Sequence, residues 1–169
     1  MMRHAALGIA YIIKRLRVDA DNGRMYWLDA TKHHRNLVGK EAGCARKTHS
    51  GKYYWIIQID GVPYRRSQLI FAVTTGSWPV EQVDHRDGLS LNDRPDNLRP
   101  ATQMQNAWNH KGRRKRSGLP MGIRKLPYGR FEARITYKKV LRSIGVFDSL
   151  NDAVSAYQNQ RKECFGEYA

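Results

Sequence analysis

The segment VDHRDGLSLNDRPDNLRPATQMQN, from Val83 to Asn106, places glycine, proline, aspartate and asparagine close together near the middle of the chain. These residues favour turns and disfavour the interior of helices and strands, so only short elements fit beside them. EQVDH (81–85) and NLRPAT (97–102) are typical of two short strands, and TQMQNAWNH (102–110) has helical character. The segment therefore predicts a small strand–loop–strand–helix unit that presents polar side chains.

This segment is acidic in a basic chain. The 169 residues include 30 Lys and Arg against 15 Asp and Glu, a net charge of +15, and 41% are hydrophobic. The charge is +8 over residues 1–80, −2 over 81–110 and +9 over 111–169. Repulsion of this size destabilises a folded chain unless a polyanion screens it, and nucleic acid gains affinity by releasing counterions. We expect a nucleic-acid-binding protein with an acidic centre between basic flanks.

The N-terminal flank has strand and helix signals. The turn DNG (21–23) followed by RMYWL (24–28) weakly indicates strands. YYWIIQI (53–59), the dipeptide DG (60–61) and VPYRR (62–66) are typical of a hairpin. SQLIFAVTTG (67–76) indicates a helix that Gly76 ends.

The C-terminal flank begins with KGRRKRSGLP (111–120), a basic run without apolar periodicity. We expect it to be a linker that lies along a phosphate backbone, or else a solvated tether; its basic residues are Arg113, Arg114, Lys115 and Arg116. Three strand-like pieces follow at 121–126, 130–137 and 141–147. A helix is predicted from Leu150 to Cys164, capped by Asp148 or Ser149.

Two cysteines, Cys44 and Cys164, lie 120 positions apart without a CxxC pair, so neither a structural zinc site nor a disulfide framework is expected. The apolar run at residues 5–13 is too short to span a bilayer, and no small-residue cleavage site follows it. We expect an intracellular protein with no membrane partner and no organic cofactor.

The residues of the acidic centre suit phosphodiester hydrolysis. That reaction needs a hard divalent cation, a general base, and a group that orients the base. Asp84 and Asn106 offer oxygen ligands for Mg²⁺ or Mn²⁺, and His85 is the natural base. The amide of Asn97 is expected to brace the loop that carries His85. The remaining aspartates of the loop are expected to form turns: Asp87, Asp93 and Asp96.

VDH (83–85), NLR (97–99) and QN (105–106) resemble the HNH endonuclease family of the phage and homing type, with twelve residues from His85 to Asn97 and nine from Asn97 to Asn106. The resemblance implies that Asp84 and Asn106 bind one divalent cation, that His85 is the general base, and that Asn97 is structural. Asn106 stands where the third letter of the HNH motif has histidine. The resemblance therefore implies a preference for oxygen-seeking metals over zinc. His110 remains an alternative ligand to Asn106.

GIRK (122–125), GRFEARI (129–135), IGVFDS (144–149) and AVSAY (153–157) resemble the Apetala-two, or ethylene-response-factor, DNA-binding domain. The resemblance implies a three-stranded sheet packed on one helix, with its exposed face in the major groove. Strand alternation places Arg130, Glu132, Arg134 and Thr136 on one face. Arg124 and Arg142 would contact DNA from the flanking strands. The plant family's tryptophans are absent here.

Together these features predict an α+β chain with four parts: a β-containing N-terminal region (1–80), a ββα-metal HNH core (81–110), the linker (111–120) and an Apetala-two-like domain (121–169). We expect a metal-dependent, site-specific nicking endonuclease for double-stranded DNA, acting as a monomer or weak dimer, in the bacterial cytoplasm if phage-encoded. A non-catalytic DNA-binding regulator is the chief alternative. An RNA-binding protein is a second, with Tyr53, Tyr54 and Trp55 as a stacking platform, but we expect these three residues to form hairpin core.

Overall fold

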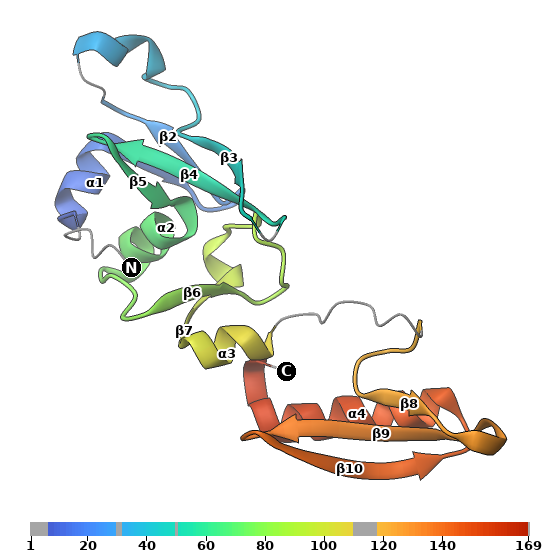
Figure 1. Ribbon diagram of the computed structural model, residues 1–169. Coiled ribbons are helices and arrows are strands. Elements are labelled where there is room, and N and C mark those ends of the chain that lie inside the picture. Colours follow the sequence, from blue (N-terminus) through green and yellow to red (C-terminus); the bar gives the residue numbers. More distant parts are fainter. Residues whose placement is uncertain (1–6, 30–31, 50, 110–117, 169) are drawn as a thin grey trace. The chain divides into compact units, whose positions relative to one another are not determined.

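The computed structural model describes residues 7–29, 32–49, 51–109 and 118–168 (Figure 1). Helices and small antiparallel sheets alternate along the chain, so the predicted α+β class is confirmed. The chain divides into two units, residues 1–103 and 104–169, called unit 1 and unit 2 below. This division passes through the predicted core at 81–110, and the four domain limits stay a prediction.

The described residues of unit 1 form three antiparallel sheets: β1–β2, β3–β4–β5 and β6–β7. Its elements, in chain order, are α1 (Ile9–Arg15), β1 (Leu16–Asp19), β2 (Arg24–Trp27), a 3-10 helix (Lys32–Leu37), β3 (Cys44–Lys47), β4 (Tyr53–Ile59), β5 (Val62–Arg65), α2 (Arg66–Thr75), β6 (Gln82–His85), a 3-10 helix (Pro95–Asn97) and β7 (Leu98–Ala101). No helix among the described residues is both long and apolar enough to cross a membrane.

The predicted hairpin and the helix after it are confirmed. β4 and β5 are joined by Asp60 and Gly61 at φ 49° and 79°, the conformation that an Asp-Gly hairpin turn requires. α2 starts directly after β5 and ends at Gly76, whose φ of 73° is left-handed. The structure adds α1 and β3, which the sequence did not predict.

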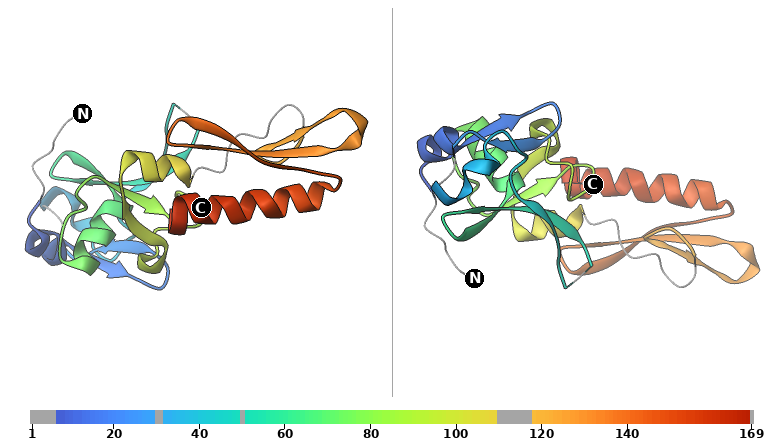
Figure 2. Two further views of the ribbon diagram at one scale, coloured as in Figure 1. Left: turned by 90° about the horizontal axis from the view of Figure 1, so that it is seen from below. Right: turned by 90° about the horizontal axis from the view of Figure 1, so that it is seen from above.

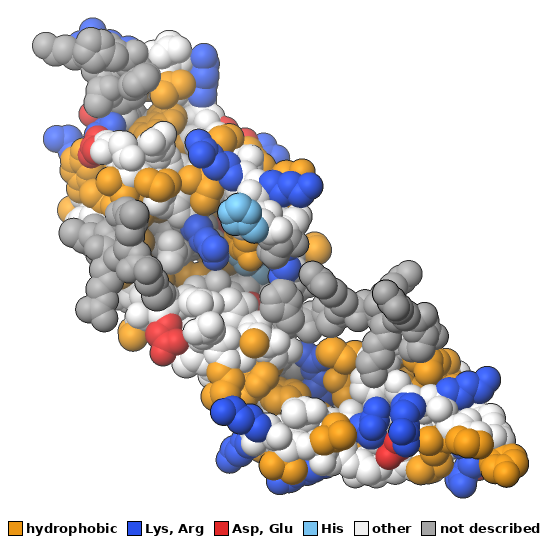
Figure 3. Space-filling view, viewed as in Figure 1, with side chains coloured by type: hydrophobic (Ala, Val, Ile, Leu, Met, Phe, Trp, Pro, Cys, Tyr) orange, Lys and Arg blue, Asp and Glu red, His pale blue; other side chains and the backbone are white. Residues whose placement is uncertain are grey.

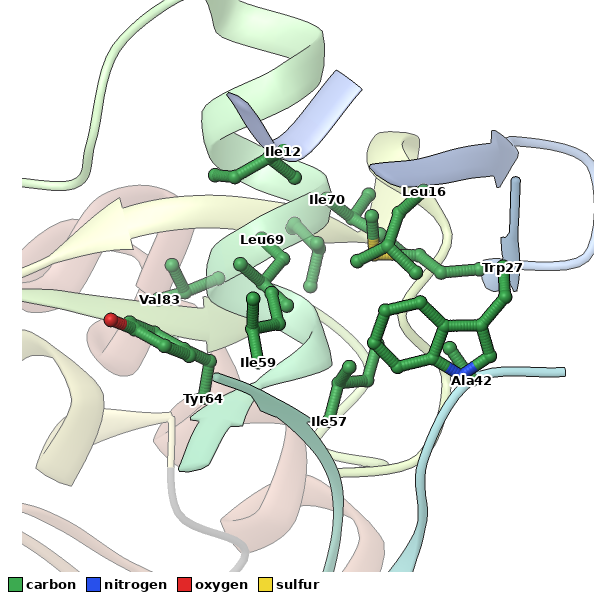
Figure 4. Packing of buried hydrophobic residues seen from close by; sticks show 12 residues of the cluster. Ile12, Leu16, Trp27, Ala42, Ile57, Ile59, Tyr64, Leu69, Ile70 and Val83 are labelled. Carbon is green, nitrogen blue, oxygen red and sulfur yellow. The ribbon is translucent and has the colours of Figure 1, made fainter. Parts of the chain in front are cut away.

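One apolar core holds unit 1 together (Figure 4). α2 contacts β4 and β5, β6 and β7, and also β2, so it joins three sheets. Val83 of β6 lies in this core with Leu69 of α2 and Tyr64 of β5. The expectation that residues 53–55 all form hairpin core is wrong in part: Tyr53 is 47% exposed, and the half-buried Tyr54 lies under the Arg65 guanidinium at 4.2 Å.

Unit 2 contains one antiparallel sheet in the order β8–β9–β10, with α4 along one face (Figure 2). Ser149 caps α4 by accepting a hydrogen bond from the Asn151 amide at 3.1 Å. A small core of Ile123, Ala133 and Ala153 joins sheet and helix. The elements are α3 (Gln103–Trp108, whose first residue belongs to unit 1), β8 (Ile123–Lys125), a 3-10 turn (Pro127–Gly129), β9 (Phe131–Tyr137), β10 (Val140–Phe147), α4 (Leu150–Phe165) and a 3-10 turn (Gly166–Tyr168). The three strands and the helix were predicted.

Candidate active site

The hairpin of β6 and β7 carries the centre of the candidate site. Val83 fixes β6 to the core of unit 1, and the next two residues, Asp84 and His85, end the strand. Both are buried, with 4% and 7% of their surface exposed. In the register of the hairpin Asp84 lies opposite Arg99, and His85 lies opposite Leu98. Two titratable side chains are therefore held at a strand end with little freedom.

Asp84 forms a buried ion pair with Arg99. Its Oδ2 accepts hydrogen bonds from Nε at 2.9 Å and from Nη2 at 2.8 Å of the guanidinium. The two side chains are 5% and 2% exposed. A buried carboxylate requires such a partner, because losing hydration without compensation is costly. The sequence did not predict this role for Arg99.

His85 contacts a second carboxylate. Its Nε2 lies 2.7 Å from Oδ1 of Asp93, and the other oxygen of Asp93 accepts a hydrogen bond from Nε of Arg66 at 2.7 Å. Asp93 is 2% exposed and Arg66 4%. The expectation that Asp93 only forms a turn is therefore wrong: it is a buried bridge between the histidine and an arginine at the start of α2.

Arg66 is itself held on several sides. Its Nη1 lies 2.9 Å from Oε1 of Glu41, and its Nη2 donates to the carbonyl oxygen of Leu91 at 3.3 Å. The guanidinium carbon lies 4.5 Å from the centre of the Trp55 ring. Because three other groups hold the guanidinium, it keeps Asp93 in a fixed position.

A glycine allows the turn between β1 and β2 to approach the loop beside Asp93. Gly23 has φ +61°, and a Cβ built there would lie 2.4 Å from the Arg94 amide nitrogen and 2.5 Å from the Asp93 carbonyl carbon. Any larger residue would displace that backbone. The turn predicted at 21–23 therefore helps to position Asp93. This role of the turn could not be predicted from the sequence.

Asn97 organises the loop that follows His85. Its amide nitrogen donates to Asp87 Oδ1 at 3.1 Å and to the Asn92 carbonyl oxygen at 2.7 Å, and its Oδ1 accepts from the Asp87 amide at 3.1 Å. Burial raises the pKa of Asp87, but hydrogen bonds from Asn92, Leu89 and Asn97 outweigh it and hold the pKa below its usual value. The loop is thus closed by half-buried polar contacts, with Asp87 as a turn-forming acceptor. Asp96, in contrast, is a surface residue.

The predicted metal ligands lie in different units. Asp84 belongs to β6 of unit 1, whereas Asn106 lies on α3 within unit 2. Both offer oxygen atoms, which suit a hard cation such as Mg²⁺. Oδ2 of Asp84 already accepts two hydrogen bonds from Arg99, so a cation at that atom would have to share it with a guanidinium or displace the guanidinium. Within the described ranges no cluster of three or more His, Cys, Asp or Glu is placed to hold a metal ion. His110 lies outside them.

Of the predicted DNA-contacting arginines of unit 2, Arg124, Arg134 and Arg142 lie on its sheet, and Arg130 directly precedes β9. Arg124 pairs with Glu132 at 2.9 Å, Arg134 lies 3.7 Å from the same carboxylate, and Arg130 pairs with Asp148 at 2.8 Å. Arg142 is an exposed residue of β10. Figure 3 shows Lys and Arg side chains gathered over β8–β10, with an acidic side chain among them. The linker residues Arg113, Arg114, Lys115 and Arg116 lie outside the described residues.

Comparison with known proteins finds similarity over part of this chain. Residues 64–108 match the HNH endonuclease family. An uncharacterized HNH endonuclease of Acanthamoeba polyphaga mimivirus is 29% identical over 127 residues, which cover 70% of this chain and 66% of that relative, just under two thirds of its length. No solved structure matches the chain. The matched segment contains Asp84, His85 and Asn97, and it also contains Arg66. The similarity to the HNH endonuclease family therefore begins before α2 and extends through α3.

Proposed function

We propose that this chain is a metal-dependent endonuclease that hydrolyses phosphodiester bonds of double-stranded DNA. The observation that carries the proposal is the position of His85: a histidine at the end of β6, bonded to a carboxylate, inside the segment that matches the HNH endonuclease family. A histidine fixed by an acidic partner is the arrangement in which imidazole serves as a general base.

In this reaction His85 accepts a proton from water as the water oxygen attacks phosphorus. The bond between phosphorus and the 3′ oxygen breaks, and the leaving oxygen takes up a proton from solvent water. A divalent cation, Mg²⁺ or Mn²⁺, would be held by Asp84 and Asn106 and would neutralise charge on the phosphate and the leaving oxygen. Asn97 keeps the loop after His85 closed while DNA binds.

The basic flanks would supply the attraction for DNA. Exposed or partly exposed arginines on or directly beside the β8–β10 sheet would contact phosphates or base edges in the manner of an Apetala-two domain: Arg124, Arg130, Arg134 and Arg142. Selectivity for a site would then depend on unit 2. One catalytic histidine and one cation act on one strand, so a protomer acting alone would nick double-stranded DNA. As for phage and homing enzymes of the HNH type, we place this activity inside the cell.

Incubation of supercoiled plasmid with the purified chain and Mg²⁺ tests the proposal, with a chelator as the negative control. The expected product is open circular DNA, and His85→Ala should reduce its rate of formation by about 10²–10⁴-fold with DNA binding retained. His49→Ala is a matched control, because His49 is an exposed histidine of the same unit. Specific DNA binding without any cleavage would favour a non-catalytic regulator. Equal cleavage by the two histidine variants would remove His85 from the reaction.

A further inference from the structure

We propose that Asp93 and Arg66 are positioning residues that select the ring nitrogen with which His85 takes up a proton. The inference rests on the proposed function, and it concerns two residues outside the VDH, NLR and QN motifs. Arg66 begins α2, Asp93 lies in the loop after β6, and His85 ends β6, so the fold brings together three separate segments.

The direction of each hydrogen bond follows from the chemistry of its groups. Arginine has only donors, so Nε of Arg66 must donate to Oδ2 of Asp93 across their 2.7 Å contact. A carboxylate has only acceptors, so Oδ1 must accept from Nε2 of His85 across the second 2.7 Å contact. A neutral imidazole carries one proton. When the ring of His85 is neutral, this contact places its proton on Nε2 and its lone pair on Nδ1, the nitrogen that would take up the proton of water.

Arg66 fixes the orientation of this carboxylate as well as its charge. The guanidinium is bonded to Glu41 and to the Leu91 carbonyl oxygen and lies over Trp55, so it cannot follow a rotating Asp93 without losing those contacts. All of these contacts to the guanidinium come from unit 1. The guanidinium can only donate and the carboxylate can only accept, so both hydrogen bonds run toward Asp93.

Asp93→Asn turns this reasoning into a test, because the amide has nearly the shape of the carboxylate. Arg66 still only donates, so the amide oxygen must face Arg66 and the amide nitrogen must face His85. Nε2 of His85 then has to accept, and its proton moves to Nδ1. A purely structural role for Asp93 predicts lower stability and an unchanged histidine tautomer.

The experiment uses the full chain with ¹⁵N-labelled histidine and records the ring nitrogens by long-range ¹H–¹⁵N NMR at alkaline pH, without added metal. Protonated and unprotonated ring nitrogens resonate in separate regions, and His85→Ala assigns the His85 signals among those of the six histidines. The expected result is a proton on Nε2 in the unsubstituted chain and on Nδ1 in Asp93→Asn. Asp96→Asn, on an exposed aspartate of the same loop, should change neither.

Plasmid cleavage provides the second readout. Asp93→Asn should lower the rate constant at saturating DNA by about 10⁴-fold, as expected for a base held in the wrong tautomer, with unchanged affinity for DNA. A proton on Nδ1 in the unsubstituted chain would overturn the proposal without any variant, even if Asp93→Asn fails to fold. So would an unchanged tautomer in Asp93→Asn, or full cleavage by it. If the unsubstituted chain shows the Nε2 tautomer but cleaves no DNA, the proposed function is wrong, and the two failures are thus distinguished.

Discussion

Replacing Arg99 with methionine should destabilise unit 1 severely, because it removes the guanidinium and leaves the Asp84 carboxylate buried. Both side chains are almost inaccessible, and both hydrogen bonds to Oδ2 are shorter than 3 Å. Breaking a buried pair from one side costs about 3–5 kcal/mol. Domains of this size have about 5–15 kcal/mol of stability in total. The variant should therefore still fold, but with a much lower free energy of unfolding.

The double variant Asp84→Leu/Arg99→Met separates this loss from lost packing. Leucine has nearly the shape of aspartate, and a buried ion pair replaced by apolar side chains of similar volume costs little or nothing. The double variant should therefore be several kcal/mol more stable than Arg99→Met alone. If both variants lose the same free energy, Arg99 acts by packing and the electrostatic reasoning is refuted.

Urea unfolding followed by tryptophan fluorescence measures these differences. Trp27, Trp55 and Trp78 belong to unit 1, and a Trp108→Phe background removes the signal from unit 2. Magnesium should restore part of the stability of Arg99→Met, by about 2.7 kcal/mol when its concentration is 100 times its dissociation constant. If magnesium leaves Arg99→Met unchanged, Asp84 is not a ligand.

Three further predictions concern the loop after β6 in unit 1 and the sheet of unit 2. Asn97→Ala removes three hydrogen bonds and should lower the free energy of unfolding by about 1–3 kcal/mol, measured with the same tryptophan signal. Asp87 has a lowered pKa in the folded chain, so its carboxyl stabilises the fold above the usual value of 3.8, and this contribution is lost as the pH falls through the folded-state value. Asp87→Asn should therefore flatten the acid side of the pH–stability profile, and an unchanged profile would contradict this assignment. Glu132→Gln removes the carboxylate that neutralises Arg124, so DNA binding should tighten and the slope of log K against log salt should steepen by roughly 1, as measured by fluorescence anisotropy.

The elements that the sequence predicts are those with local signals. The hairpin of β4 and β5 has its Asp-Gly turn, α2 ends at a left-handed glycine, and α4 has its serine cap. α1 and β3 lack such signals. α1 has only seven residues, and its stability depends on Ile12 in the core, whereas every residue of β3 is exposed and the strand exists because it pairs with β4.

The same distinction divides the candidate site. His85 and Asn97 follow from motif spacing within the sequence, and the structure places them at the two ends of one loop. Arg66 and Arg99 do not, because they are two of thirty basic residues, and their partners lie 27 and 15 positions away. Nothing in a single sequence indicates which arginine meets which aspartate. Only the packing of α2 against the β6–β7 hairpin determines the contact between Arg66 and Asp93.

These contacts also bear on what the acidic centre does. Three aspartates of this segment are hydrogen-bonded within the fold: Asp84 to Arg99, Asp93 to Arg66 and His85, and Asp87 to Asn92 and Asn97. Most of the negative charge between residues 81 and 110 therefore stabilises the fold, and little of it remains to attract a cation by itself.

A cation at Asp84 should consequently bind weakly until DNA supplies further oxygen atoms. Mg²⁺ is commonly held by one or two carboxylates together with substrate phosphates, and phosphate oxygens would compensate for the guanidinium of Arg99 beside the carboxylate. Coupling between two ligands is reciprocal, so Mg²⁺ must strengthen DNA binding by the same factor by which DNA strengthens Mg²⁺ binding. His85→Ala allows both affinities to be measured without cleavage, by anisotropy for DNA and by calorimetry for Mg²⁺. A factor of about 5–150 is expected, the usual range for coupled sites. Equal DNA affinity with and without Mg²⁺ would show that the cation and the phosphate do not share a site.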